Sequence, residues 1–415
     1  MENKKMTRKM WFIVLIASFG YFVDLYDLTI FANVRVESLL ELNIPETELG
    51  TFAISLMNWT VVGFFIGGIF WGRISDIYGR KIALIGIILT FSIATIANAF
   101  IQDIAWYKAL RFFSGFGLAG EMGVGLALIK EVVPPNKTTL TNMIFLVIGM
   151  FGAVIAGVVA LSLEHTTYLS LSGWRWAFII GGVLGIILLF FRSAISESIL
   201  FEKTSENEAD TSLLYLLSDK NRRLKMLYCI LAGLPAYYIM GFLIPLSKEF
   251  GEVKLLSEIK PAIAVMIAYF SLAIFDIFAS MISIFIAKRI RVIQYYLAFQ
   301  FLAISIYLYV PIFSSIDFYF RCALLGASVG FWGLIVMNAT EQFGTNLRGT
   351  VASIVPNVVR GLLFPLTEFG YMPLKNLGFS LLHSAFIVAF FSIGIAFYAT
   401  TQLKDKFENN ADYIE

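Results

Sequence analysis

The sequence contains few charged side chains. Asp, Glu, Lys and Arg make up 14% of its 415 residues, whereas hydrophobic residues make up 59%. A soluble domain is nearer to about 25% charged, so this composition excludes an ordinary water-exposed globular surface. The chain is therefore predicted to be a polytopic membrane protein.

Cysteine and histidine are also scarce. Cys229 and Cys322 both fall in apolar segments, and His165 and His383 are isolated from each other. This pattern gives neither a disulfide framework nor a metal-ligand spacing, and the sequence shows no nucleophile–base set and no phosphate-binding loop. The net charge of +2 gives no indication of nucleic-acid binding. We expect no cofactor, no metal and no enzymatic activity.

The N-terminus resembles a signal peptide, because Lys4, Lys5, Arg8 and Lys9 precede an apolar run. That run is about 25 residues long, enough to cross a membrane, and no small-residue cleavage site follows it. We interpret it as an uncleaved first membrane helix.

Long apolar stretches recur along the chain, and about 20 residues suffice to cross the hydrocarbon core as a helix. Six such stretches lie near residues 10–35, 51–72, 82–101, 105–129, 139–163 and 174–195, and six more lie near 224–247, 261–287, 292–313, 317–340, 348–372 and 378–402. The sequence predicts an all-α membrane protein of twelve transmembrane helices in two pseudo-symmetric six-helix bundles. The predicted parts are the first bundle (1–195), a cytoplasmic linker (196–222), the second bundle (223–403) and a cytoplasmic tail (404–415).

Lys and Arg outside the spans are concentrated on the side that carries both termini, as at residues 73–81 and 192–225. Positive charge favours the cytoplasmic side. We therefore expect an integral protein of the plasma (inner) membrane with both termini in the cytoplasm.

An internal repeat supports a duplicated half. Arg111 precedes Glu131 by 20 residues in the fourth span, and Arg321 precedes Glu341 by 20 residues in the tenth, at an offset of 210 residues. Repeated halves are common among secondary transporters.

The loop between spans two and three, "GRISDIYGRK" (72–81), matches the G-x-x-x-D-x-x-G-R-K pattern of the major facilitator superfamily. Span four reads "RFFSGFGLAGE" (111–121), which resembles the R-x-x-x-G-x-G motif of the same superfamily. The resemblance covers the whole chain and implies the major facilitator fold and a transporter that works by alternating access.

A narrower resemblance is to the metabolite:proton symporters and the related sugar porters. It rests on "DLYDLTIF" (24–31), "WRWAF" (174–178), "RSAISES" (192–198) and "EQFGTNLRGT" (341–350). The resemblance implies a proton site that pairs an Asp of the first helix with an Arg of the fourth. Here these positions hold Asp27 and Arg111, which lie at similar depths in their spans.

Two further acids are candidates for proton coupling. Asp24 shares a helical face with Asp27 because the two are three residues apart; it is a second proton site, a substrate contact or a vestibule residue. Glu121 belongs to a carboxylate relay with Asp24 or is a buried acid that fixes packing. An ionised carboxylate at mid-membrane is costly and needs a cavity or a partner.

The second half supplies candidate substrate contacts near the midplane. Arg360 has a fork suited to a carboxylate or phosphate, and the alternative is a structural pair with Asp276 at matching depth. The other candidates are polar or aromatic residues that could line the same cavity: Asn357, Arg321, Trp332, Asn338, Tyr237, Tyr238, Asn58 and Trp59.

Gating residues are expected at the cytoplasmic face. Asp76 can approach the start of helix eleven near Arg348, where the helix dipole and a cation favour it. The full predicted set is Gly72, Asp76, Gly79, Arg80, Lys81, Glu131, Glu341 and Arg348.

The favoured function is a proton-coupled importer of a small polar, possibly anionic metabolite such as an organic acid or amino acid. A proton-driven exporter is the first alternative, although span five lacks the proline of the antiporter motif; a non-transporting membrane sensor is the second. The expected partners are substrate, protons and lipid, with no nucleic acid, and the expected state is a monomer.

Overall fold

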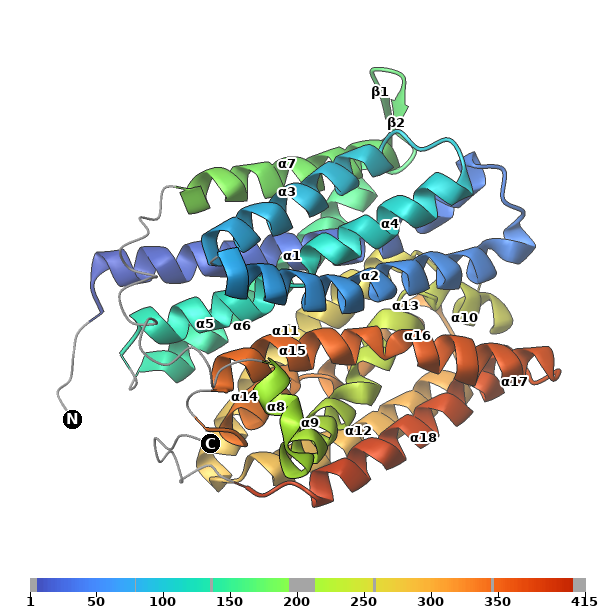
Figure 1. Ribbon diagram of the computed structural model, residues 1–415. Helices are drawn as coiled ribbons and strands as arrows, with labels where there is room; N and C mark the ends of the chain where they lie inside the picture. Colours follow the sequence, from blue (N-terminus) through green and yellow to red (C-terminus); the bar gives the residue numbers. More distant parts are fainter. Residues whose placement is uncertain are drawn as a thin grey trace.

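The computed structural model describes residues 6–78, 80–134, 137–193, 213–256, 259–344 and 347–405. Ten of the described helices are long and apolar enough to cross a membrane, and Ile82–Asn98 is a shorter apolar helix. The chain is a polytopic membrane protein built almost entirely of helices (Figure 1).

The first half contains six membrane-crossing segments. They are α1 (Arg8–Glu41), α2 (Leu49–Tyr78), α3 (Arg80–Asn98), the consecutive pair α4 (Ile104–Leu118) and α5 (Glu121–Val132), which together form one segment, α6 (Thr138–Leu163) and α7 (Gly173–Ser193). A short helix η1 (Glu46–Glu48) precedes α2, and an antiparallel hairpin of β1 (Thr167–Tyr168) and β2 (Leu171–Ser172) precedes α7.

The second half repeats this arrangement. A short α8 (Leu213–Ser218) leads to α9 (Lys220–Tyr238), which continues as a π-helical turn, η5 (Ile239–Leu243); a short α10 (Ser247–Val253) then precedes α11 (Pro261–Ile286) and α12 (Arg289–Tyr309). The tenth segment is the pair α13 (Ser315–Ser328) and α14 (Trp332–Glu341). The eleventh comprises α15 (Arg348–Gly361), α16 (Leu363–Pro365), the π-helical η6 (Leu366–Tyr371) and α17 (Met372–Asn376), and the last is α18 (Leu381–Thr401).

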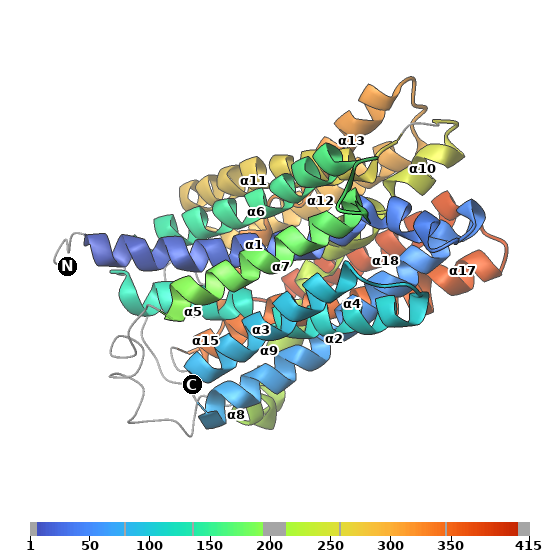
Figure 2. The same ribbon diagram turned by 90° about the horizontal axis from the view of Figure 1, so that it is seen from above.

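The two halves pack side by side along their length, the first above the second in Figure 1. Figure 2 shows the same bundle from above, with the helices again lying lengthwise. Between them α6 packs against α11, and α15 packs against α2 and α5. Helix α1 begins and helix α18 ends at the same end of the bundle, which is here called the terminal end. The opposite end is called the far end.

Helices four and ten are both interrupted, at positions 210 residues apart. The breaks lie at Gly120, between α4 and α5, and at Gly330, between α13 and α14. A break leaves backbone groups without helical partners. Asn357 donates from its side chain to the Ala119 carbonyl at the first break, and Asp276 accepts from the Gly333 amide at the second, at 2.9 Å.

Glycines allow close packing of the membrane helices, because a residue without a side chain lets two backbones approach each other. A Cβ on Gly63 of α2 would lie 2.1 Å from the Phe112 carbonyl of α4, and one on Gly115 of α4 would lie 2.0 Å from the Thr60 carbonyl of α2. Neither position has room for a larger residue unless the two helices move apart.

Candidate functional site

A pocket lies between the two halves, in the part of the membrane region nearer the far end. The first half contributes Leu28, Thr29, Phe31, Ala32, Met57, Thr60, Val61 and Arg111; the second contributes Tyr237, Met240, Gly241, Pro245, Val265, Tyr269 and Leu363. Arg111 is the only charged residue of this lining. The pocket is thus apolar and aromatic, with a single cationic group.

Arg111 is held so that part of its guanidinium stays available. Its Nε donates to the Thr60 hydroxyl at 3.1 Å, and its guanidinium carbon lies 5.1 Å from the centroid of the Phe31 ring. The side chain is buried, yet Nη1 has no hydrogen-bond partner among the described residues. A buried unpaired donor is costly, so this group is suited to an anionic ligand.

Asp27 does not form an ion pair with Arg111 among the described residues, although the two lie within electrostatic range. Asp27 instead accepts a short hydrogen bond from Thr95, and its Oδ2 has no partner in the described part of the chain. The sequence places both residues near each other correctly but predicts a direct contact that this structure lacks.

The ion pair in the centre of the molecule joins Asp24 and Arg360. Nη1 of Arg360, on α15 of the second half, lies 3.3 Å from Oδ2 of Asp24, on α1 of the first. Both side chains are buried. The alternative pair of Arg360 with Asp276 is wrong for this structure, since Asp276 caps the start of α14 instead.

Glu121 has a partner of its own. Arg192, at the end of α7, donates to both its carboxylate oxygens, at 3.1 and 2.5 Å. Glu121 interacts with Asp24 through space only. The packing alternative therefore describes its contacts better than the relay does, and the motif "RSAISES" supplies the partner through its Arg.

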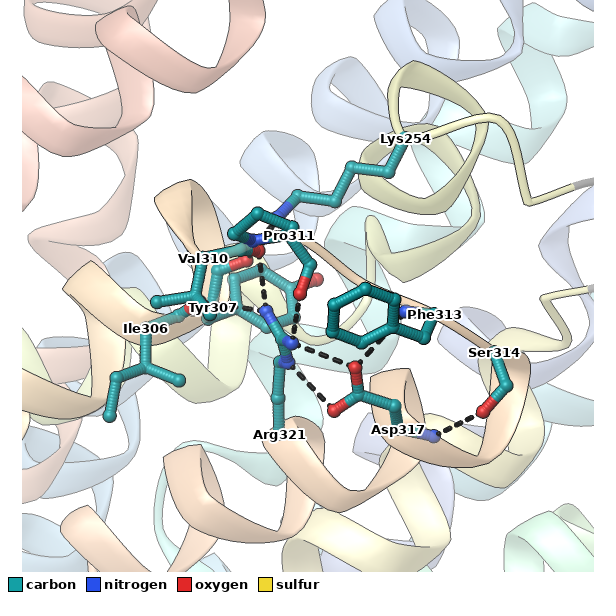
Figure 3. A network of polar contacts seen from close by, with 9 residues as sticks. All are labelled: Lys254, Ile306, Tyr307, Val310, Pro311, Phe313, Ser314, Asp317 and Arg321. Atoms are coloured by element: carbon teal, nitrogen blue, oxygen red, sulfur yellow. Dashed lines mark hydrogen bonds and ion pairs between the residues drawn. The ribbon is translucent and has the colours of Figure 1, made fainter.

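Arg321 does not belong to the pocket, contrary to the sequence prediction. Its guanidinium donates to the carbonyls of Ile306, Val310 and Pro311, at 3.1, 2.6 and 2.6 Å, and pairs with Asp317 at 2.8 Å. Figure 3 shows these contacts, with Lys254 reaching the same chain segment. Arg321 thus satisfies the carbonyl groups at the end of α12.

Other predicted substrate contacts have structural partners. Trp59 is 45% exposed and packs edge-to-face on Phe112; the Tyr238 hydroxyl donates to the Ala385 carbonyl at 3.2 Å; and Asn338 accepts from Gln342 at 3.3 Å. None of these three residues is among those that line the pocket described above. Asn357, bound to the break in helix four, contacts the first half rather than the pocket.

Two predicted residues do lie at the centre. Tyr237 lines the pocket, and Trp332 is buried near Tyr21.

Polar contacts join the two halves at the far end, above the pocket. Arg35 of α1 donates to the Pro245 carbonyl at 3.0 Å and to Glu249 of α10 at 2.7 Å. Asn58 of α2 accepts from Thr367 at 2.7 Å and donates to Glu368 at 3.2 Å. Pro245 itself lines the pocket, so its contact with Arg35 closes the pocket on the side of the far end.

A third far-end contact joins Lys260 to Glu164 at 2.6 Å, and the Glu164 carboxylate raises the pKa of the Lys260 ammonium. His165 is also less isolated than its sequence position suggests, since it lies 3.8 Å from carboxylates of both Glu37 and Glu164. These three residues can hold a metal ion geometrically, but Lys260 already occupies one of the carboxylates.

Arg35 and Tyr269 are not among the residues predicted from the sequence, although a signal exists for both. Arg35 is 11 residues after Asp24, about three helical turns, and so lies on the same face of α1. Tyr269 is seven residues, about two turns, before Asp276 on α11. A polar residue repeated at these intervals on an apolar helix marks the face directed at the protein interior.

Gating predictions are described only in part. Gly79 and the side chains of Asp76, Arg80, Lys81 and Glu131 lie outside the described residues, and Gly72 lies in α2. At the same end, Glu341 pairs with Arg289 at 2.6 Å, and Arg348 donates to the Phe343 carbonyl at 3.2 Å. Asp405 accepts from the amides of Arg289 and Ile290.

The family model described as Major Facilitator Superfamily matches residues 17–366. This chain belongs to the major facilitator superfamily. The fold agrees: the xylose transporter XylE from E. coli, in a partially occluded inward-open conformation, superposes with a TM-score of 0.72 at 14% identity over 96% of this chain and 99% of that one. The prediction of two six-helix bundles is confirmed.

Two curated relatives carry a substrate in their names. The gentisate transporter of Corynebacterium glutamicum is 33% identical over 165 residues, 40% of this chain and 35% of the relative. The niacin transporter of Acinetobacter baylyi is 26% identical over 199 residues, 48% of this chain and 43% of the relative. The chain matches less than half the length of each of these superfamily members.

Proposed function

We propose that this superfamily member is a proton-coupled importer of small aromatic carboxylates that works by alternating access. In this proposal it lies in the plasma membrane with its terminal end in the cytoplasm. The observation that carries the proposal is the buried ion pair between Asp24 and Arg360, because it joins the two halves that must move relative to each other.

The pair gives a physical route to coupling. Separating a buried ion pair without compensation costs about 3–5 kcal/mol, since an unpaired charge stays buried. A proton on Asp24 removes its attraction for Arg360 and leaves an unbalanced positive charge there. An anionic substrate bound at Arg111 offsets that charge through space, since the pocket residue Tyr237 lies within electrostatic range of both arginines. Proton and anion together therefore release the contact between the halves more easily than either does alone, which favours symport.

The pocket supports an aromatic acid as the substrate. Its walls are apolar and aromatic, and Arg111 offers an unpaired nitrogen to a carboxylate. An arginine binds a carboxylate through charge-assisted hydrogen bonds. Gentisate and niacin, named for the two relatives, are both aromatic rings that carry a carboxyl group.

The test is uptake into proteoliposomes from a panel of labelled organic acids, with and without an imposed pH gradient. We expect gradient-driven accumulation of an aromatic acid. Asp24→Asn should abolish this accumulation and retain counterflow exchange. The Asn amide is uncharged, like the protonated carboxyl of Asp24, but it cannot bind or release a proton. Glu252→Gln, an exposed carboxylate at the far end, is the matched control.

Asp27→Asn distinguishes the two acids. The family resemblance favours Asp27 as the proton carrier, whereas this proposal places the proton on Asp24 because Asp24 forms the contact across the halves. Accumulation that survives in Asp24→Asn and disappears in Asp27→Asn would return the proton to Asp27 and refute this proposal.

A further inference from the structure

Two buried tyrosines in the pocket have hydroxyl groups without a partner. Tyr237 of α9 is 8% exposed and Tyr269 of α11 is 6% exposed, and both line the pocket. In the described part of the chain neither hydroxyl makes a hydrogen bond. Buried tyrosine hydroxyls usually find a partner, as Tyr26 does with the Ala177 carbonyl at 3.0 Å.

Both tyrosines belong to the second half, whereas Arg111 belongs to the first. Tyr237 lies within electrostatic range of both Arg111 and Arg360, and Tyr269 lies within range of Tyr237 and Arg360. The two hydroxyls thus form a polar patch in an otherwise apolar wall, on the side of the pocket that leads to Arg360.

The backbone fixes the position of the Tyr237 ring. Gly241, one turn later in the π-helical η5, also lines the pocket, and a Cβ there would lie 2.9 Å from Cε1 of Tyr237. The ring therefore lies against the Gly241 backbone. A π-helical turn often occurs at a functional site, and here it contains the Gly241 that the Tyr237 ring packs against.

We propose that Tyr237 and Tyr269 are specificity-determining residues that hydrogen-bond a second polar group on the substrate ring, while Arg111 holds the carboxylate. This inference rests on the proposed function and deepens it. The preferred ligand is an aromatic acid with a ring hydroxyl or ring nitrogen, which contacts both halves at once. An acid with a bare ring leaves both hydroxyls buried without a partner, and sites of this kind reject such analogues.

The experiment compares uptake of para-hydroxybenzoate, meta-hydroxybenzoate and benzoate by the full-length protein in proteoliposomes. We expect at least one hydroxylated acid to be taken up about tenfold more efficiently than benzoate. This is the difference in uptake that roughly one hydrogen bond to the ring hydroxyl would produce. Tyr237→Phe and Tyr269→Phe should each reduce this ratio several-fold. Gly241→Ala should reduce it also, because it displaces the Tyr237 ring without removing the hydroxyl.

Tyr238→Phe is the matched control, since Tyr238 is the neighbouring buried tyrosine and its hydroxyl is bound to the Ala385 carbonyl. It should leave the ratio unchanged. Uptake of all three acids with equal efficiency would overturn this inference alone, as would an unchanged ratio in both pocket variants. Uptake of none of them under a proton gradient would overturn the aromatic substrate class and, with it, this inference.

Discussion

Arg360 and Asp24 lie 336 positions apart in the chain, and their side chains meet at 3.3 Å in the interior between the two halves. The pair is incompletely satisfied, because Oδ1 of Asp24 and Nε of Arg360 have no hydrogen-bond partner among the described residues. A buried pair of this kind adds little net stability, but the loss of one partner is expensive. These properties suit a contact that forms and breaks during transport.

Single and double substitutions of this pair should differ in stability. Arg360→Met leaves Asp24 as an unpaired buried carboxylate and should destabilise the protein by about 3–5 kcal/mol. The double variant Asp24→Leu, Arg360→Met removes both charges and should recover most of that loss. The apparent thermal unfolding midpoint in detergent measures the difference; a double variant no more stable than the single one would contradict the argument.

Arg321 and Arg111 occupy matching positions in the two halves, and we expect their substitution to have opposite effects. Arg321→Gln removes hydrogen bonds to three carbonyls and the pair with Asp317, so it should cost about 3 kcal/mol of stability. Uptake per folded molecule should change little. Arg111→Gln should instead largely abolish uptake, because it removes the only charge in the pocket lining.

The measurement combines thermal unfolding with uptake normalised to folded protein. An Arg321→Gln protein that is stable but inactive would show that Arg321 does contact substrate, as the sequence alone predicts.

The positions of the membrane segments and of their buried charges were predictable from the sequence. Apolar length fixes the spans, and charge inside a span marks the interior. Asp24, Arg111 and Arg360 are therefore identified without a structure, as is the repeat that relates helices four and ten.

The partners of those charges were not predictable. Depth along a span places Arg360 near both Asp276 and Asp24, and only the rotation of each helix about its axis decides between them. Arg111 and Arg321 share a repeat position, but Arg321 lies beside the chain end at Val310 and Pro311, which takes its hydrogen bonds. The rotation of α2 about its axis also explains why Trp59 faces outward, since the neighbouring Asn58 faces the second half and donates to Glu368.

The contact between α2 and α4 predicts the effect of adding one methyl group. Gly63→Ala places a Cβ 2.1 Å from the Phe112 carbonyl, and since backbone cannot yield cheaply, the helices must separate. Overpacking of this kind costs about 1–3 kcal/mol. Gly394→Ala in α18 is the matched control, because no described residue outside its own stretch of helix lies within 4 Å of its Cβ position.

Unfolding midpoints of the two variants provide the check. Gly394→Ala should be neutral or slightly stabilising, since alanine is a better helix former than glycine. Equal effects of the two substitutions would mean that helix propensity, and not the close approach, decides the outcome.

Lys254 should make stability depend on pH. It lies between α10 and α11, outside the membrane segments, and its Nζ donates to the Tyr307 carbonyl at 2.8 Å. Partial burial, and next the Arg321 guanidinium, lower the pKa of the ammonium from 10.5 to about 8, against the opposing effect of Asp317. At a pH between these two pKa values, Lys254 is therefore protonated in the unfolded chain and has released its proton in the folded chain.

Because the unfolded state binds more protons in that window, the free energy of unfolding rises as the pH increases from about 8 to about 10.5. Below the window both states are protonated and the contribution of Lys254 stays at its lowest. Lys254→Met has no charge to titrate and Lys254→Arg keeps its charge, so both should lose this rise. Unfolding midpoints measured across this pH window test the prediction. Neither variant has a group at position 254 that releases a proton between about pH 8 and 10.5. If the midpoint of both variants still rises as much as that of the wild type, the pH dependence belongs to another group.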